Sequence, residues 1–229
     1  MLPARVSWLG HAALVLKKDL AIERRTGEVV TTAGFFAILV VVLSSVAFTF
    51  GDSRVSVSPG VVWVSVAFAA VLAIGRSWHR EREESAMLGL LVSPVSSSAL
   101  FAGKATGIFL FLLAVELMVV PATALLFSLD LVSLAPGLAL IALAATPGIA
   151  ASGTLFGAMT VRTRARDLVL ASVLFPLLSP TLLAAVGATR ELVGGAPLAE
   201  LWDYLMLMVT FDVVFALGGL TLFGALVEG

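Results

Sequence analysis

Few residues of this chain could carry chemistry, and the nucleotide-binding pattern among them is incomplete. Gly103-Lys104 resembles the end of a Walker A loop, but Ser98 replaces the first glycine of that motif and Ala105 replaces its closing Ser or Thr. No His-Glu-x-x-His or Gly-x-Ser-x-Gly pattern occurs, and there is no cysteine. We therefore expect no catalytic residue and no metal site in this chain, and we predict that it is not an enzyme.

The two histidines, His11 and His79, are the side chains that could ligate a haem iron. Both fall among charged residues at the ends of apolar segments, where a hydrated surface histidine is the ordinary outcome. We therefore assign no cofactor-binding residue.

Glu116 and Asp212 are two acidic residues inside long apolar blocks. An ionised acid at mid-bilayer costs a few kcal/mol on insertion scales, so such a residue usually faces a cavity or a partner. Two interpretations stay open for each. The acid either lines a polar cavity or links helices, or it is protonated and hydrogen-bonded to a neighbouring hydroxyl group.

Composition indicates what must position these residues. Hydrophobic residues make up 60% of the 229 and charged residues only 13%, against about 25% in a soluble domain. The apolar residues fall in blocks of about twenty, the length that crosses a bilayer as a helix. The sequence therefore predicts an all-α, polytopic membrane protein in a single transmembrane domain, residues 1–229. With a net charge of −1, we expect the lipid bilayer and no nucleic acid as a partner.

Six spans are predicted, at about 29–50, 57–75, 105–127, 136–159, 168–186 and 204–226. The fifth is interrupted by Pro176 and Pro180, and a polar outer segment follows it from Thr189. The fourth contains Gly153-x-x-x-Gly157, a spacing that lets a neighbouring helix approach closely.

Residues 85–103 are uncharged but are not predicted to span, because Ser93-Pro94 and three successive serines are costly in lipid. With this stretch in the cytoplasm, only Arg54 and Arg190 of the 14 Lys and Arg residues lie outside and 12 lie inside. If it spanned, five would lie outside. The positive-inside rule therefore favours six spans with both termini in the cytoplasm.

Residues 2–25 are predicted to form an amphipathic helix, with the apolar face Val6, Leu9, Ala13, Leu16 and Leu20. Its lysines and arginines make it too charged to span. We expect it to lie in the cytoplasmic interface of the membrane, with its basic side toward the headgroups.

Several stretches resemble the CcmB family, the membrane subunits of the cytochrome c maturation ABC complex. They are Arg80-Glu-Arg-Glu-Glu-Ser-Ala-Met-Leu-Gly-Leu-Leu-Val-Ser-Pro94, Ala102-Gly-Lys104, Leu113-Ala-Val-Glu116 and Arg24-Arg25 before the first span. The resemblance extends over the whole chain. One departure is Leu88, where family members often carry glutamate.

The resemblance implies an ABC-2-type permease-like fold in the inner membrane and a CcmA-type ATPase as partner. It also implies CcmC- and CcmD-type membrane subunits and a role in delivering haem to c-type cytochromes. Haem is then a ligand that is transported or handled. Whether haem itself moves, or ATP releases a haem-loaded chaperone, stays open. The alternatives are an ABC-2-type export permease for a drug or polysaccharide, and a secondary transporter or assembly scaffold.

A cytoplasmic segment between spans two and three, residues 76–104, suits coupling to a separate ATPase. The residues that we expect to contribute are Arg80, Glu81, Arg82, Glu83, Glu84, Leu90, Leu91 and Pro94. Its charged first part would meet the ATPase, and its apolar part would lie against the bilayer or fill a groove. The alternative is an interfacial loop whose charges extend to water.

Overall fold

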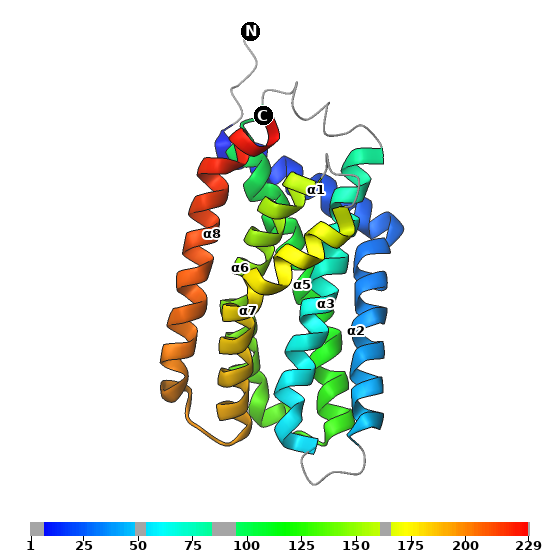
Figure 1. Cartoon of the computed structure of the whole chain (residues 1–229), viewed down its shortest axis with the longest axis vertical. Coiled ribbons are helices and arrows are strands. Elements are labelled where there is room, and N and C mark those ends of the chain that lie inside the picture. Colours follow the sequence, from blue (N-terminus) through cyan, green and yellow to red (C-terminus); the bar gives the residue numbers. More distant parts are fainter. Residues whose placement is uncertain (1–6, 49–53, 84–94, 161–165, 229) are drawn as a thin grey trace.

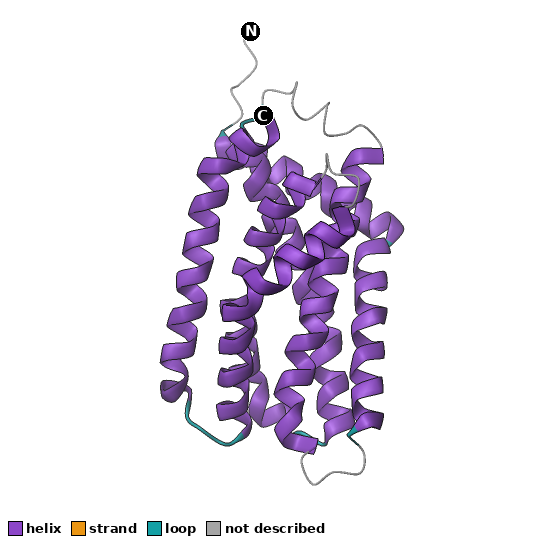
Figure 2. Cartoon of the chain, in the orientation of Figure 1, coloured by secondary structure: helices purple, strands orange, loops and turns teal. Residues whose placement is uncertain are grey.

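The computed structural model describes residues 7–48, 54–83, 95–160 and 166–228, and the regular structure in these ranges is entirely helical (Figure 2). Six of the helices are long and apolar enough to cross a membrane, which confirms the predicted all-α polytopic protein. The elements are α1 (Trp8–Thr26), α2 (Glu28–Ala47), α3 (Arg54–Glu83), α5 (Ser97–Phe127), α6 (Leu131–Thr160), α7 (Arg166–Val193), the short 3-10 helix η1 (Leu198–Leu201) and α8 (Trp202–Glu228).

The six long helices stand side by side, and α1 lies across one end of the bundle (Figure 1). Successive spans run in opposite directions, so α1 and the C-terminal end of α8 lie at the same end, which we call the α1 end. Among the spans, α3 is the most buried and α8 the least. The core is therefore formed around α3, α5 and α6, while α8 presents most of its surface outward.

Gly27 forms the tight turn between α1 and α2. Gly27 has φ +62°, a left-handed conformation that glycine adopts without steric cost, and its N–H donates to the Glu23 carbonyl at 2.7 Å. The Glu23 carboxylate then accepts hydrogen bonds from the N–H groups of Val29 and Val30, at 3.2 and 2.8 Å. These are N–H groups that the first turn of a helix leaves without an internal partner, so Glu23 caps α2 from the preceding helix.

The helices on either side of the expected coupling segment are longer than predicted. Helix α3 continues through the charged residues to Glu83 instead of ending near residue 75. Helix α5 begins at Ser97 instead of 105, with the Ser96 hydroxyl oxygen accepting from the Ala99 N–H at 3.3 Å. Charged side chains did not end these helices because several of them form ion pairs at the α1 end. Residues 84–94 lie outside the described part of the chain.

The face that α1 turns toward the bundle includes acidic residues that the sequence did not single out. Val15, Asp19 and Glu23 are buried, whereas Leu9 is 71% exposed. Leu16 and Leu20 of the predicted apolar stripe are partly buried, Leu20 against the core, so the inward face combines part of that stripe with two acidic residues. Their partners, a lysine on α5 and the N-terminus of α2, are supplied by tertiary structure.

Helix α7 is continuous through Pro176 and Pro180, and it extends to Val193 through part of the expected outer loop. Its first part lies at an angle to the rest (Figure 1), as expected when proline removes backbone hydrogen bonds inside a helix. Gly153 and Gly157 of α6 face the side chains of Ile74 and Trp78, which is the close approach that their spacing predicted.

Candidate functional site: an ionic cluster and two intramembrane acids

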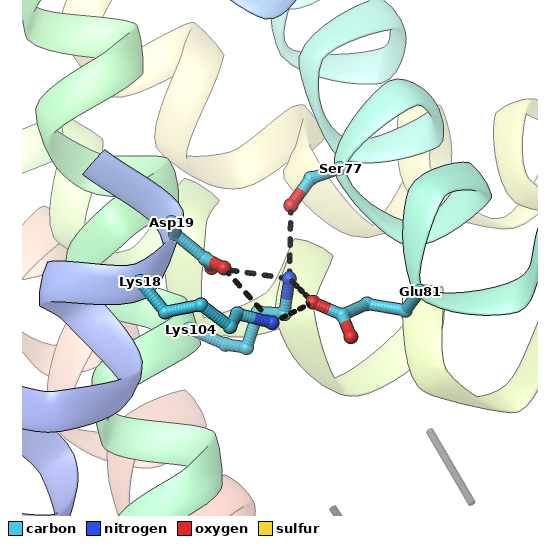
Figure 3. A network of polar contacts seen from close by, with 5 residues as sticks. All are labelled: Lys18, Asp19, Ser77, Glu81 and Lys104. Carbon is cyan, nitrogen blue, oxygen red and sulfur yellow. Dashed lines mark hydrogen bonds and ion pairs between the residues drawn. The ribbon is translucent and has the colours of Figure 1, made fainter. Parts of the chain in front are cut away.

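Four charged side chains from three helices meet at the α1 end, and we call them the ionic cluster: Lys18 and Asp19 of α1, Glu81 of α3 and Lys104 of α5. Lys104 Nζ lies 3.0 Å from Asp19 Oδ2 and 2.6 Å from Glu81 Oε1. Lys18 forms ion pairs with the same two acids. Figure 3 shows both ammonium groups between the two carboxylates, with Ser77 Oγ 3.5 Å from Lys104 Nζ.

Charge balance makes this burial tolerable. The side chain of Lys104 is only 2% exposed, and those of Asp19 and Glu81 are 7% and 4% exposed. Burial alone would raise the pKa of Glu81, but Lys104 and Lys18 outweigh it and hold that pKa below its ordinary value. For Lys18, burial lowers the pKa, but Asp19 and Glu81 together raise it by more, so the net shift is upward. Two cations and two anions thus stabilise one another, three of them buried and Lys18 partly exposed.

Glycines on α5 allow α1 to reach Lys104. A Cβ atom at Gly103 would lie 2.6 Å from the Ala12 carbonyl oxygen and 2.7 Å from Val15 Cβ, closer than atoms pack. A Cβ atom at Gly107, one turn further, would lie 3.6 Å from Asp19 Oδ2. The two helices therefore touch along a glycine face, and the lysine between these glycines meets the acid of α1.

Aromatic and polar contacts reinforce the same end of the molecule. Lys104 Nζ lies 5.4 Å from the centroid of the Trp78 ring, a cation–π distance. The Trp8 Nε1–H group donates to Ser98 Oγ at 2.9 Å, which joins α1 to α5 again. Arg76 pairs with Glu28 at 3.1 Å and joins α3 to α2 in a more exposed position. Helices α1, α2, α3 and α5 are therefore held together at this end.

Of the residues expected to couple to an ATPase, the structure describes the side chain of Glu81 alone. That carboxylate is buried in the ionic cluster and does not extend outward as predicted. Arg80, Arg82 and Glu83 belong to the end of α3. Glu84, Leu90, Leu91 and Pro94 lie outside the described residues.

Sequence reasoning assigned no role to Asp19 or to the Lys104 side chain, and treated Gly103-Lys104 as an imperfect phosphate-binding motif and as part of the family resemblance. The signal that could have found them is Gly103-x-x-x-Gly107 enclosing a lysine in a helix whose one other charged residue is Glu116. Such a lysine needs an acidic partner from a helix that approaches the glycines.

Glu116 links α5 to α6 inside the membrane-spanning bundle. Its side chain is buried, and Thr146 Oγ1 donates to Glu116 Oε1 at 2.7 Å. The same hydroxyl lies 2.7 Å from the Ala142 carbonyl oxygen. The Thr146 hydroxyl group therefore connects the Glu116 side chain of α5 to the backbone of α6. Glu116 is thus hydrogen-bonded to a neighbouring hydroxyl group. That hydroxyl group belongs to a different helix, so the contact also links α5 to α6.

Asp212 of α8 lies against the backbone of α6. A Cβ atom at Gly148 would overlap Asp212 Oδ1 and would lie 3.4 Å from the Asp212 Cα atom. The absence of a side chain at Gly148 therefore makes room for the acid. Thr146 and Gly148 flank Pro147, so both intramembrane acids contact the turn of α6 where proline removes a backbone donor.

The two histidines, which the sequence placed at the surface, are both partly buried in the structure. His11 belongs to α1 and His79 to the end of α3, so both lie toward the α1 end of the bundle. Neither is part of the ionic cluster.

Comparison with known proteins gives a match along nearly the whole chain. A sequence model described as CcmB protein matches residues 11–225. The chain is 27% identical over 184 residues to the heme exporter protein B of Pseudomonas aeruginosa, covering 80% of this chain and 82% of that protein. It is 26% identical over 184 residues to the heme exporter protein B of Bradyrhizobium diazoefficiens, covering 79% and 82%. The matched region runs from α1 to α8.

Proposed function

This chain belongs to the CcmB protein family, and on that premise we propose that it is the permease subunit of an ABC complex that delivers haem for cytochrome c maturation. Two relatives named heme exporter protein B and six membrane-spanning helices support this role. The chain has no complete phosphate-binding loop, so ATP hydrolysis belongs to a separate CcmA-type ATPase. CcmC- and CcmD-type membrane subunits complete the complex.

The orientation follows from the distribution of basic residues. We place the α1 end in the cytoplasm and the protein in the inner membrane, because this topology assigns 12 of the 14 Lys and Arg residues to cytoplasmic segments of the sequence. Reporter fusions after Ser98 and after Gly229 should therefore read as cytoplasmic. A fusion after Asp130, between α5 and α6, serves as the control and should read as periplasmic. A periplasmic reading at Ser98 or Gly229 would contradict the topology.

The ionic cluster is the observation that carries the coupling role. Helix α3 ends at Glu83, and Glu81 near this end is joined to Lys104 of α5 and Lys18 of α1. A force applied by an ATPase to the end of α3 would therefore act on α5 and α1 together, because packed helices joined by buried ion pairs move as a unit. Coupling then requires no contact between the ATPase and the spans themselves.

Separate variants distinguish contact with the ATPase from transmission through the cluster. Arg80→Glu combined with Arg82→Glu should weaken co-purification of the ATPase, because it changes charges at the proposed contact. Glu81→Gln should leave co-purification intact but lower cytochrome c maturation, since its carboxylate is buried within this chain. Membrane abundance of each variant is the control. Unchanged co-purification after the double reversal would remove the contact role.

A further inference from the structure

A cavity of about 430 Å³ opens between α5 and α6, and we call it the α5–α6 groove. Its walls include Glu116, Leu117 and Pro121 of α5, with Ala135, Ala139 and Leu143 of α6. Glu116 is the only ionisable side chain among its lining residues, the others being apolar. The groove is therefore a lipid-facing apolar surface with one carboxyl group in its wall.

One oxygen of that carboxyl group is left without a partner. Thr146 occupies Glu116 Oε1, whereas Glu116 Oε2 is buried and has no hydrogen bond to any described residue. The residue as a whole is 4% exposed. A buried acceptor left unpaired is costly, and in hydrocarbon no water is present to reduce the cost. The chain on its own thus leaves an acceptor unfilled beside an open groove.

The depth of Glu116 in the bilayer restricts which groups can donate a hydrogen bond to its unpaired oxygen. Phe127, the last residue of α5, lies eleven positions after Glu116, which corresponds to about 16 Å along the helix. Lipid headgroups lie at the membrane surface, and acyl chains carry no hydrogen-bond donor. The lipid therefore does not supply the donor, whereas a side chain of a second transmembrane helix can carry one to this depth.

The side of the groove formed by α6 has a surface against which a second helix can pack. Ala135 and Ala139 are exposed one turn apart, and small residues with this spacing let a second helix approach closely. Leu117 on one rim is 77% exposed and Leu143 on the other is 55% exposed. An apolar helix seated between these leucines would cover both.

We propose that the α5–α6 groove is the docking site for a transmembrane helix of a partner subunit, and that this helix presents a hydrogen-bond donor to Glu116 Oε2. The partner helix is apolar and carries one Ser, Thr, Tyr, His, Lys or Arg side chain near mid-bilayer. The inference rests on the proposed function only in requiring a membrane subunit in the same complex.

The test is photo-crosslinking within the intact complex. Benzoylphenylalanine replaces Leu117, and adducts are mapped by mass spectrometry after co-purification through the ATPase. We expect a covalent adduct to a membrane helix that has a donor within one turn of the attachment point. The same probe at Leu43 of α2, which is 60% exposed, is the matched position away from the groove and should give lipid adducts.

Two further variants address the carboxyl group and the groove separately. Glu116→Leu should lower the adduct yield about fivefold, because it removes an interhelical hydrogen bond, whereas Glu116→Gln should retain most of it. Ala139→Leu fills the groove at an exposed position and should also lower the yield, without changing Glu116.

The outcomes separate this proposal from the proposed function. Lipid adducts alone at Leu117, while the ATPase still co-purifies, would overturn the docking site. Attachment to a helix without a donor, or an unchanged yield in Glu116→Leu, would overturn it as well. Failure of the unmodified chain to co-purify with any ATPase would instead count against the proposed function.

Discussion

Lys104 Nζ lies 2.6 Å from Glu81 Oε1, and this ion pair joins the start of one membrane-spanning helix to the end of another. Replacing Lys104 with Met would leave Asp19 and Glu81 buried with Lys18 as the one cation that the described side chains place against them. We expect the free energy of unfolding to fall by about 3–5 kcal/mol, the usual cost of removing one partner from a buried ion pair. Thermal unfolding of the detergent-purified protein measures it.

The control for that change is the double variant Lys104→Met with Glu81→Gln. It leaves one cation, Lys18, with one anion, Asp19, so the cluster remains balanced. Its loss of stability should therefore be smaller than the sum of the two single losses. Additive losses would mean that the two residues do not stabilise each other.

Gly103→Ala should separate α1 from α5. The added methyl group would meet the Ala12 carbonyl oxygen at 2.6 Å, and backbone atoms cannot move aside as a flexible side chain can. We expect a loss of about 1–3 kcal/mol in the free energy of unfolding, typical of overpacking. Gly218→Ala in α8 is the matched control, because no atom lies within 4 Å of its added methyl group. That variant should be neutral or slightly stabilising, since alanine favours a helix over glycine.

Glu116→Gln and Glu116→Leu separate the hydrogen bond of this residue from its charge. Gln can accept the Thr146 hydrogen bond and also offers an amide, whereas Leu can do neither. We expect both variants to insert normally and Leu to lower cytochrome c maturation at least about threefold more than Gln does. Haem-stained c-type cytochrome in complemented cells, normalised to membrane abundance, is the measurement. Full activity of Glu116→Leu at normal abundance would show that the residue is incidental.

Asp212 and Gly148 should behave as a coupled pair. Gly148→Ala introduces a methyl group that overlaps Asp212 Oδ1, so we expect it to destabilise the contact of α8 with α6. Adding Asp212→Ala removes the overlapping oxygen and should restore much of the stability, because the remaining distances to the Asp212 backbone are 3.4 Å. Equal unfolding temperatures for the single and double variants would contradict this explanation.

The number and order of the spans could be predicted from sequence, because uncharged apolar blocks of about twenty residues are typical of membrane-spanning helices. The helices extend beyond the predicted span ends at residues 75 and 105 for a physical reason. A charge was assumed to mark the end of a span, but Glu81 and Lys104 neutralise each other and both helices continue past them. Pro176 and Pro180 likewise lie within α7, which continues to Val193.

The site was harder to predict because its parts are distant in sequence. Glu116 and Asp212 were evident as acids in apolar blocks, but Thr146 and Gly148 carry no signal of their own as partners. Asp19 was taken for part of an amphipathic surface helix, since its partner lies on a helix far along the chain. Composition indicates that a buried charge needs a partner, and only the packing of the helices identifies it.

Because the chain is synthesised from its N-terminus, the residues of the ionic cluster reach the membrane in a fixed order. Lys104 is made 85 residues after Asp19 and 23 residues after Glu81, so both acids have left the ribosome when the lysine reaches the membrane. The α5 span can then insert with its ammonium group neutralised at once. A chain that lacked α1 would deliver the same lysine to a half-formed site. We therefore expect the N-terminal helix to act during biogenesis, by helping the third span to enter the bilayer.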